Sequence, residues 1–326
     1  MPSVAMLLRQ IRNVPRAEFN AVALSVVVSV VLLAIKFVAF YVTGSAAIFS
    51  DALESIVNVA ASFFAAYSLF LAHQPADAKH PYGHGKIEFL SAGFEGGMIL
   101  LAAFIITARA IQEMVKGPTV ERVDLGLLLM AIAGLVNGAV GLYLIRAGRS
   151  RRSVTLVADG KHLLSDAVTS AGVIVALLLV KLTGNRWIDP IAAIVVALYI
   201  AALAIHLLRE SAAGLMDQQD VSDEAMLRGI LDSHLAPDGK QPQICSYHKL
   251  RHRHSGRYHW VDFHIMVPAS WDVKHGHEVA SSIEYEIEKA IGEGNATAHV
   301  EPCVDNSCAV CGAPQAARDG LISSGN

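Results

Sequence analysis

Residues 21–42 read AVALSVVVSVVLLAIKFVAFYV, a stretch in which Lys36 is the only charged residue. A helix needs about 20 mostly apolar residues to cross the hydrocarbon core of a bilayer. The run is long enough for this purpose, and it is too long for the apolar segment of a secretory signal peptide. The stretch therefore predicts a membrane-spanning helix.

Five further apolar stretches predict five more spans, so we expect an α-helical membrane protein with six transmembrane helices. They cover residues 46–71, 89–110, 125–144, 155–180 and 188–208. The composition agrees, because 53% of the residues are hydrophobic and only 17% are charged, against about 25% charged in soluble domains. This composition excludes disordered, collagenous and disulfide-rich secreted chains, and the net charge of −3 gives no indication of a nucleic-acid partner.

The basic residues predict the orientation of the spans, because Lys and Arg accumulate on the cytoplasmic side. Nine of them flank the spans on one side and four on the other. The nine are Arg9, Arg12, Arg16, Lys79, Lys86, Arg146, Arg149, Arg151 and Arg152, and the four are Lys116, Arg122, Lys181 and Arg186. Both termini are therefore expected in the cytoplasm.

The chain becomes polar after Leu208, where a cytoplasmic C-terminal domain is expected. Ser222 is the predicted N-cap of a helix that ends near Leu235. Two strands, a second helix and a third strand follow, at residues 246–253, 258–267, 275–291 and 296–301. The order αββαβ predicts a small α+β domain. The expected division is an N-terminal tail (1–19), the membrane domain (20–210), the cytoplasmic domain (211–303) and a Cys-containing polar tail (304–326).

Ionisable residues inside the predicted spans indicate a functional site, because burying them in lipid is unfavourable. Asp51, Glu54 and Asn58 lie on one face of the second span, and His162 and Asp166 lie on one face of the fifth. Glu54 and His162 are each nine residues from the membrane entry of their helix, about 14 Å deep. One imidazole, two carboxylates and an amide suit a divalent cation, whereas the alternative is a hydrogen-bond network that joins two helices. Three other polar residues of the spans receive no transport role: Lys36, Glu95 and Asn137.

Other candidate metal ligands lie outside the spans. Asp77, His80 and His84 form a D-x2-H-x3-H pattern in the connection between the second and third spans. The C-terminal domain is rich in histidines whose clustering suits Zn²⁺ or a multinuclear site: His248, His252, His254, His259, His264, His275, His277 and His299. Strand alternation places Tyr258, Trp260, Asp262 and His264 on one face. Cys303, Cys308 and Cys311 form a candidate thiolate site, with a flexible thiol-bearing tail as the alternative.

Three motifs resemble the cation diffusion facilitator family, in its bacterial branch of zinc and ferrous-iron efflux proteins. They are GSAAIFSDALES from Gly44, HPYGHGK from His80 and ADGKHLLSD from Ala158. The resemblance covers about residues 20–303. It implies six transmembrane helices, a cytoplasmic αββαβ domain with a metallochaperone-like fold, and a homodimer that exchanges a divalent metal ion for protons by alternating access.

The resemblance also implies residue roles. The transport site comprises Glu54, Asn58, His162 and Asp166, with Asp51 as an additional carboxylate, and the loop site comprises Asp77, His80 and His84. The cytoplasmic site comprises His248, His264, His277, His299 and Glu301, and Lys86 pairs with Asp217 between the domains. Glu54-x3-Asn58 replaces the Asp-x3-Asp that is usual in this branch, so one carboxylate is missing.

The predicted function is proton-coupled export of divalent metal ions across the bacterial inner membrane, and no enzymatic activity is expected. Zn²⁺ is the expected substrate, and Fe²⁺, Cd²⁺, Co²⁺ and Mn²⁺ remain open alternatives. A membrane-embedded metal sensor that does not transport ions is the first alternative. A membrane metalloenzyme is the second, although it would require an open metal position beside a general base.

Overall fold

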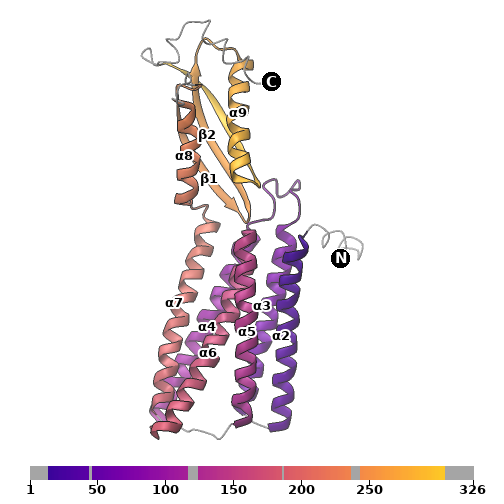
Figure 1. Cartoon of the computed structure of the whole chain (residues 1–326), viewed down its shortest axis with the longest axis vertical. Coiled ribbons are helices and arrows are strands. Elements are labelled where there is room, and N and C mark those ends of the chain that lie inside the picture. The colour runs from indigo at the N-terminus through magenta and orange to yellow at the C-terminus, as the bar shows by residue number, and fades with distance from the viewer. Residues whose placement is uncertain (1–13, 44–45, 117–123, 186, 236–242, 305–326) are drawn as a thin grey trace. The chain divides into compact units, whose positions relative to one another are not determined.

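The computed structural model describes residues 14–43, 46–116, 124–185, 187–235 and 243–304. Within some described helices, individual side chains also lie outside the description, including those of Asp51 and Glu54. The chain divides into two compact units between Met216 and Asp217. The N-terminal unit consists of long helices, and the C-terminal unit combines helices with a sheet (Figure 1).

Six long helices build the N-terminal unit. They are α2 (Arg16–Thr43), α3 (Ala46–Ala72), α4 (Ile87–Lys116), α5 (Asp124–Arg151), α6 (Val154–Thr183) and α7 (Ile188–Leu215). Within the described residues, four segments are long and apolar enough to cross a membrane: Arg16–Val38, Ile87–Lys116, Ala131–Arg151 and Pro190–Leu215. The N-terminal unit is therefore a helical membrane domain.

These four segments agree with four of the six predicted spans. The described apolar part of α3 is the shorter stretch Asn58–Ala72. The first half of α6 is interrupted by Asp159, Lys161 and Asp166, which lower its apolar character. The two helices without a fully apolar span are thus the two that carry the predicted transport residues.

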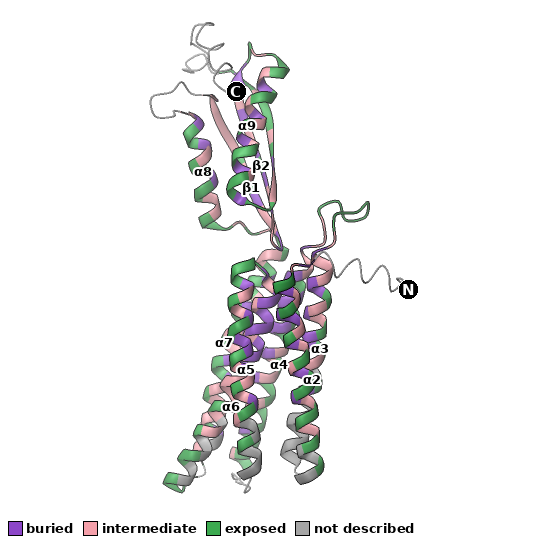
Figure 2. Ribbon diagram, turned by 45° about the vertical axis from the view of Figure 1, so that its right-hand side comes forward, coloured by how far each residue is buried: buried purple, intermediate pink, exposed green. Residues whose placement is uncertain are grey.

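Helix α6 lies at the centre of the N-terminal unit and contacts each of the other five long helices. Leu156 and Leu163 of α6 pack in a hydrophobic cluster with residues of α2, α3 and α5. Ala158 packs in a second cluster with residues of α4 and α7. Figure 2 shows these buried residues in the interior, while exposed residues lie along the outer faces of the helices. The polar residues of α6 are consequently held inside the bundle.

Two glycines bring α5 and α6 into close contact. A Cβ atom added to Gly141 would lie 2.8 Å from the Gly160 carbonyl oxygen, and one added to Gly160 would lie 2.8 Å from the Gly141 carbonyl oxygen. Such distances are too short for any side chain at these positions. Small residues allow close backbone approach between membrane helices, and this contact fixes α6 against α5 just before His162.

The C-terminal unit has the predicted order αββαβ. It contains α8 (Val221–Leu235), β1 (Ser246–Ser255), β2 (Tyr258–Pro268), α9 (Val273–Ile291) and β3 (Gly294–Cys303). The sheet order is β1-β2-β3, with an antiparallel β1–β2 hairpin and a parallel β2–β3 pair that α9 connects. The prediction of an α+β domain in this part of the chain is confirmed.

Both helices of this unit cover the same face of the sheet. Leu227 and Leu231 of α8 and Ile283 and Ile287 of α9 share one core with Phe263 of β2. Along β2 the odd-numbered residues are buried against the helices and the even-numbered ones are partly or fully exposed as far as Met266. This alternation confirms that Tyr258, Trp260, Asp262 and His264 share a face, which is the one without helices.

A β-bulge interrupts β1 between His248 and Arg251. His248 pairs with His264, whereas Arg251 pairs with Asp262, so the register shifts by one residue. Lys249 accommodates the shift with a φ of 50°. Because successive strand residues alternate between faces, an inserted residue exchanges the faces of all residues that follow.

The cap of α8 differs from the prediction. Asp220 provides the capping carboxylate, since its Oδ1 accepts hydrogen bonds from the backbone N–H groups of Ser222 and Asp223. The Ser222 hydroxyl donates to the same oxygen instead of capping the helix itself. The chain enters the helix two residues earlier than predicted, which places a carboxylate at its positive end.

Candidate metal-transport site

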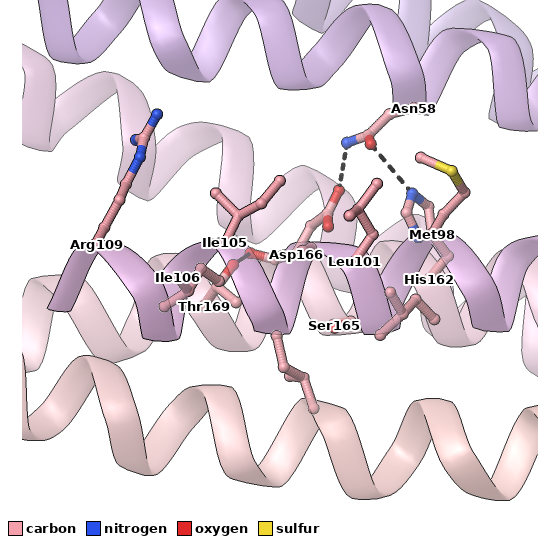
Figure 3. Close-up of a pocket in the computed structure, with 13 residues that line it drawn as sticks. Asn58, Met98, Leu101, Ile105, Ile106, Arg109, His162, Ser165, Asp166 and Thr169 are labelled. Atoms are coloured by element: carbon pink, nitrogen blue, oxygen red, sulfur yellow. Dashed lines mark hydrogen bonds between the residues drawn. The ribbon is translucent and has the colours of Figure 1, made fainter. Parts of the chain in front are cut away.

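Asn58, His162 and Asp166 form one hydrogen-bonded group between α3 and α6 (Figure 3). The Asn58 amide Nδ2 donates to Asp166 Oδ2 at 2.7 Å, and Asn58 Oδ1 accepts from His162 Nε2 at 3.2 Å. An amide oxygen can only accept, so the proton of the imidazole lies on Nε2. The structure therefore brings together three of the four residues predicted for the transport site.

The fourth predicted residue, Glu54, and the additional carboxylate, Asp51, belong to α3 by their backbone. Their side chains lie outside the described residues. Glu54 stands four residues before Asn58 in the same helix, so the two share one helix face. Its participation in the site stays a prediction.

Glu95 of α4 is a residue of this site that sequence reasoning left without a role. Its side chain is fully buried, and its Oε2 lies 3.9 Å from His162 Nδ1. A signal was present in the sequence, because Glu95 and His162 each follow the first residue of their helix by eight positions. Two helices that start on the same side of a membrane place such residues at equal depth. Asp159, one turn before His162, is also fully buried.

A cavity of about 290 Å³ adjoins the group. Its polar lining includes Asn58, His162, Asp166, Ser165 and Thr169. The rest of its wall is mostly apolar and comes largely from α4, where Met98, Leu101 and Ile105 point toward the site and Arg109 stands away from His162 (Figure 3). The cavity has room for a hydrated ion next to one imidazole, one carboxylate and one amide.

The loop residues Asp77, His80 and His84 also come together. Asp77 Oδ1 lies 3.1 Å from His80 Nδ1, Asp77 Oδ2 lies 3.5 Å from His84 Nε2, and the two imidazole rings are 4.5 Å apart. A backbone hydrogen bond from His80 lowers the pKa of Asp77, so its carboxylate is charged. The three side chains present a compact N2O set of metal ligands in the loop between α3 and α4.

The sheet places three of the predicted cytoplasmic ligands side by side. His248, His264 and His299 occupy paired positions on β1, β2 and β3. Glu301 Oε1 accepts from His264 Nδ1 at 2.7 Å, and its Oε2 lies 3.3 Å from His248 Nε2. The hydrogen bond from His264 lowers the pKa of Glu301. The cluster lies on the face of the sheet without helices.

The structure does not bring the remaining predicted residues into these described clusters. His277 is exposed on α9, outside the group formed by His248, His264 and Glu301. Cys303 is buried at the end of β3, while Cys308 and Cys311 lie outside the described residues. Lys86 Nζ donates to the Leu215 carbonyl at 3.5 Å, and Asp217 lies 3.8 Å from Arg253. The Lys86–Asp217 pair between the two units stays a prediction.

Two family models match this chain and together cover most of it. The cation efflux transmembrane domain matches residues 22–216. The cytoplasmic domain of cation efflux proteins matches residues 239–303. The first model corresponds to the helical membrane unit, and the second corresponds to the α+β unit.

Several relatives match over nearly their whole length. An uncharacterised transporter of Synechocystis sp. is 37% identical over 86% of this chain and 89% of its own. The cation-efflux pump FieF of Shewanella oneidensis is 26% identical over 85% of this chain and 92% of its own, and the manganese efflux system protein MneP of Bacillus subtilis is 26% identical over 86% and 94%. With its membrane unit, its α+β unit and their metal-ligand clusters, this chain belongs to the cation diffusion facilitator family of cation-efflux proteins.

Proposed function

We propose that this protein exports divalent transition-metal ions in exchange for protons, with Zn²⁺ as its main substrate. The observation that carries the proposal is the hydrogen-bonded group Asn58–His162–Asp166 beside a cavity of about 290 Å³. The ion would bind between α3 and α6, with Glu54 as a fourth ligand. Membership of an efflux family supports transport of a divalent cation, and the site chemistry supports the finer assignment.

The donor set suits a small divalent cation. Zn²⁺ accepts imidazole nitrogen and carboxylate oxygen at about 2.0–2.2 Å. The Asn58 amide nitrogen faces Asp166 in the structure. A half-turn of that amide would direct its oxygen toward an ion held by Asp166. Protein groups then replace the hydration shell that the ion would lose on entering the cavity.

Proton exchange follows from the ligands themselves, because imidazole and carboxylate bind a metal only when deprotonated. Protonation of His162 or Asp166 would release the ion, and binding of the next ion would release the protons. Glu95, buried 3.9 Å from His162 Nδ1, would stabilise the protonated imidazole. Protons and metal ions would thus share one binding region, which is formed by Glu95, His162, Asn58 and Asp166.

The membrane arrangement that fits this function has all six long helices crossing the bilayer. Although the described parts of α3 and α6 contain no long apolar segment, α6 is enclosed by the rest of the bundle. Intramembrane ionisable residues that face a bundle interior are typical of ion pathways. The excess of basic residues on one side supports cytoplasmic termini, and the bacterial inner membrane is the proposed location.

The α+β unit would act as a cytoplasmic metal-binding and dimerisation domain. The cluster His248, His264 and Glu301 lies on a sheet face that carries no helix. Its counterpart in a second copy could approach it directly, and a family model named for the cytoplasmic domain covers these residues. Metal bound there would shift the population of the homodimer toward its tightly associated state.

The proposal is tested by metal flux into sealed proteoliposomes under an imposed pH gradient, with Zn²⁺, Cd²⁺, Fe²⁺, Co²⁺ and Mn²⁺. The wild-type chain is compared with Asp166→Asn, which keeps the shape of the side chain and removes its charge. Glu278→Gln on the exposed face of α9 is the matched control, because it removes a carboxylate far along the chain from the site.

We expect Zn²⁺ flux that is abolished in Asp166→Asn and unchanged in Glu278→Gln. Flux that persists in Asp166→Asn would contradict transport through this site. Metal binding to the reconstituted protein without flux of any ion would favour a metal sensor. Hydrolytic activity that chelators block would instead favour a metalloenzyme.

A further inference from the structure

The β-bulge in β1 separates the histidines of this strand onto two faces of the sheet. His248, before the bulge, pairs with His264 on the face without helices. His252 and His254, after the bulge, pair with Val261 and His259. Directly opposed residues of an antiparallel pair lie on the same face, and Val261 belongs to the core under α8 and α9. His252, His254 and His259 thus lie on the face that the helices cover.

The three histidines meet Asp223 from the first turn of α8. His254 Nε2 lies 2.8 Å from Asp223 Oδ2, and His252 Nδ1 lies 3.0 Å from His259 Nε2. The rings of His254 and His259 stack with centroids 4.1 Å apart. One ligand atom from each of the four residues lies within 4.8 Å of those from the other three.

Two of these imidazoles are buried. His252 is 3% exposed and His259 is 1% exposed. Within the described residues, His252 Nε2 has no hydrogen-bond partner, although it is buried. Buried polar groups are normally hydrogen-bonded, so the His252 ring is only partly satisfied, and its other nitrogen, Nδ1, is the one that faces His259.

We propose that Asp223, His252, His254 and His259 form a zinc site that is separate from the cluster of His248, His264 and Glu301. Tetrahedral zinc with bonds of about 2.0–2.1 Å separates its ligand atoms by about 3.3 Å. The Asp223–His254 and His252–His259 separations of 2.8 and 3.0 Å are slightly shorter than this value. No pair of ligand atoms is more than 4.8 Å apart, so small side-chain rotations would bring all four to the distance that zinc requires. Three nitrogens and one oxygen form a ligand set that borderline divalent metals prefer.

Such an ion would fasten α8 to the β1–β2 hairpin, because Asp223 belongs to α8, His252 and His254 to β1, and His259 to β2. All four ligands come from one chain, so the site needs no second copy. Occupancy would thereby stabilise the α+β unit itself, independently of transport and of dimer formation.

The test uses the full chain in a background that removes one ligand from each of the other four candidate sites: Asp166→Ala, His84→Ala, His264→Ala and Cys308→Ser. Zinc is counted per chain after exchange against a weak chelator, and Co²⁺ is added to the metal-free protein as a spectroscopic probe of tetrahedral coordination. His259→Asn and Asp223→Asn are then introduced separately. His275→Ala is the matched control, since His275 is a half-buried histidine of the same unit that contacts Trp271.

We expect the background chain to retain about one zinc per chain and to give a tetrahedral Co²⁺ spectrum. Both substitutions should weaken binding by at least about tenfold, and the control should not. Background protein that retains no zinc, or the same zinc content in both variants, would overturn the proposal. Melting of the metal-free variants separates loss of a ligand from loss of folding: Asp223→Asn, at the half-exposed edge of the cluster, should melt as the metal-free background does.

Discussion

Asn58 on α3 donates a 2.7 Å hydrogen bond to Asp166 on α6, a residue 108 positions later in the chain. The same amide accepts from His162, so one side chain connects both metal-binding groups of α6. The amide holds the imidazole and the carboxylate in a fixed relation before any ion binds.

Replacing Asn58 by Ala should lower the apparent affinity of transport for Zn²⁺ by about 10–100-fold, the range typical of residues that orient metal ligands. The measurement is the initial rate of uptake into proteoliposomes as a function of zinc concentration. Asn137→Ala is the control, because Asn137 is also a buried amide of the membrane unit but does not line the cavity. Equal KM values for Asn58→Ala and wild type would contradict the positioning role.

Replacing Glu95 by Gln should uncouple zinc flux from the pH gradient. The carboxylate lies 3.9 Å from His162 Nδ1, and removing one partner of a buried ion pair is unfavourable by about 3–5 kcal/mol. The protonated imidazole would lose this stabilisation, while the metal ligands stay in place. The detergent-solubilised variant should therefore still bind zinc, whereas its zinc flux under a pH gradient should be lower than that of the wild type. Equal loss of binding and of flux would show that Glu95 holds the metal or the fold instead.

Replacing His84 by Ala should raise the KM for zinc and leave the maximal rate unchanged. The loop ligands Asp77, His80 and His84 lie outside the long helices, so they would gather ions without taking part in the transport step. Flux at limiting and at saturating zinc separates the two constants, and Lys79→Ala in the same loop is the control. A lower maximal rate at unchanged KM would place His84 in the transport step.

Replacing Asp220 by Ala should destabilise α8 by about 1 kcal/mol, the usual contribution of an N-cap. Ser222→Ala should have a smaller effect, because its hydroxyl only donates to the capping carboxylate. Hydrogen exchange of the α8 amides in the full chain measures both. The reverse order of the two effects would favour the cap that the sequence predicted.

The effect of Asp220→Ala should also depend on pH. Hydrogen bonds from Ser222 hold the pKa of Asp220 below its ordinary value of 3.8. A carboxyl group with a lowered pKa stabilises the folded state fully above its unfolded pKa and loses this contribution as the pH falls through the folded pKa. Wild type and Asp220→Ala should thus exchange differently near neutral pH and converge below about pH 4.

The sequence was sufficient to predict the features that depend on periodicity and depth. Long apolar runs predicted the helices, and the spacing of His162 and Asp166 placed them on one face of α6. The pairing of Asn58 with both residues followed from equal depth in two helices. The role of Glu95 did not follow, because its equal depth with His162 does not specify that α4 packs against α6 with these two side chains facing each other.

The C-terminal histidines show a second limit. With regular alternation, His248, His252 and His254 would lie on one face of β1. The register shift between His248 and Arg251 moves the latter two to the opposite face, and a lysine with positive φ provides no recognisable signal for this bulge. One cluster in the sequence therefore becomes two in the structure. The cap of α8 is a smaller case, in which Asp220, two residues before the predicted Ser222, provides the capping carboxylate.

The contact between Gly141 and Gly160 has a mechanical consequence. With no side chain between their backbones, α5 and α6 interlock at this point and resist sliding past each other. His162 and Asp166 follow Gly160 closely in α6, so we expect them to keep their position relative to α5 when the bundle rearranges. We expect the cavity to open on the Asn58 side, where hydrogen bonds from a rotatable amide join α3 to α6. The glycine pair would keep α6 fixed to α5, whereas the amide forms a contact between α3 and α6 that can break and form again.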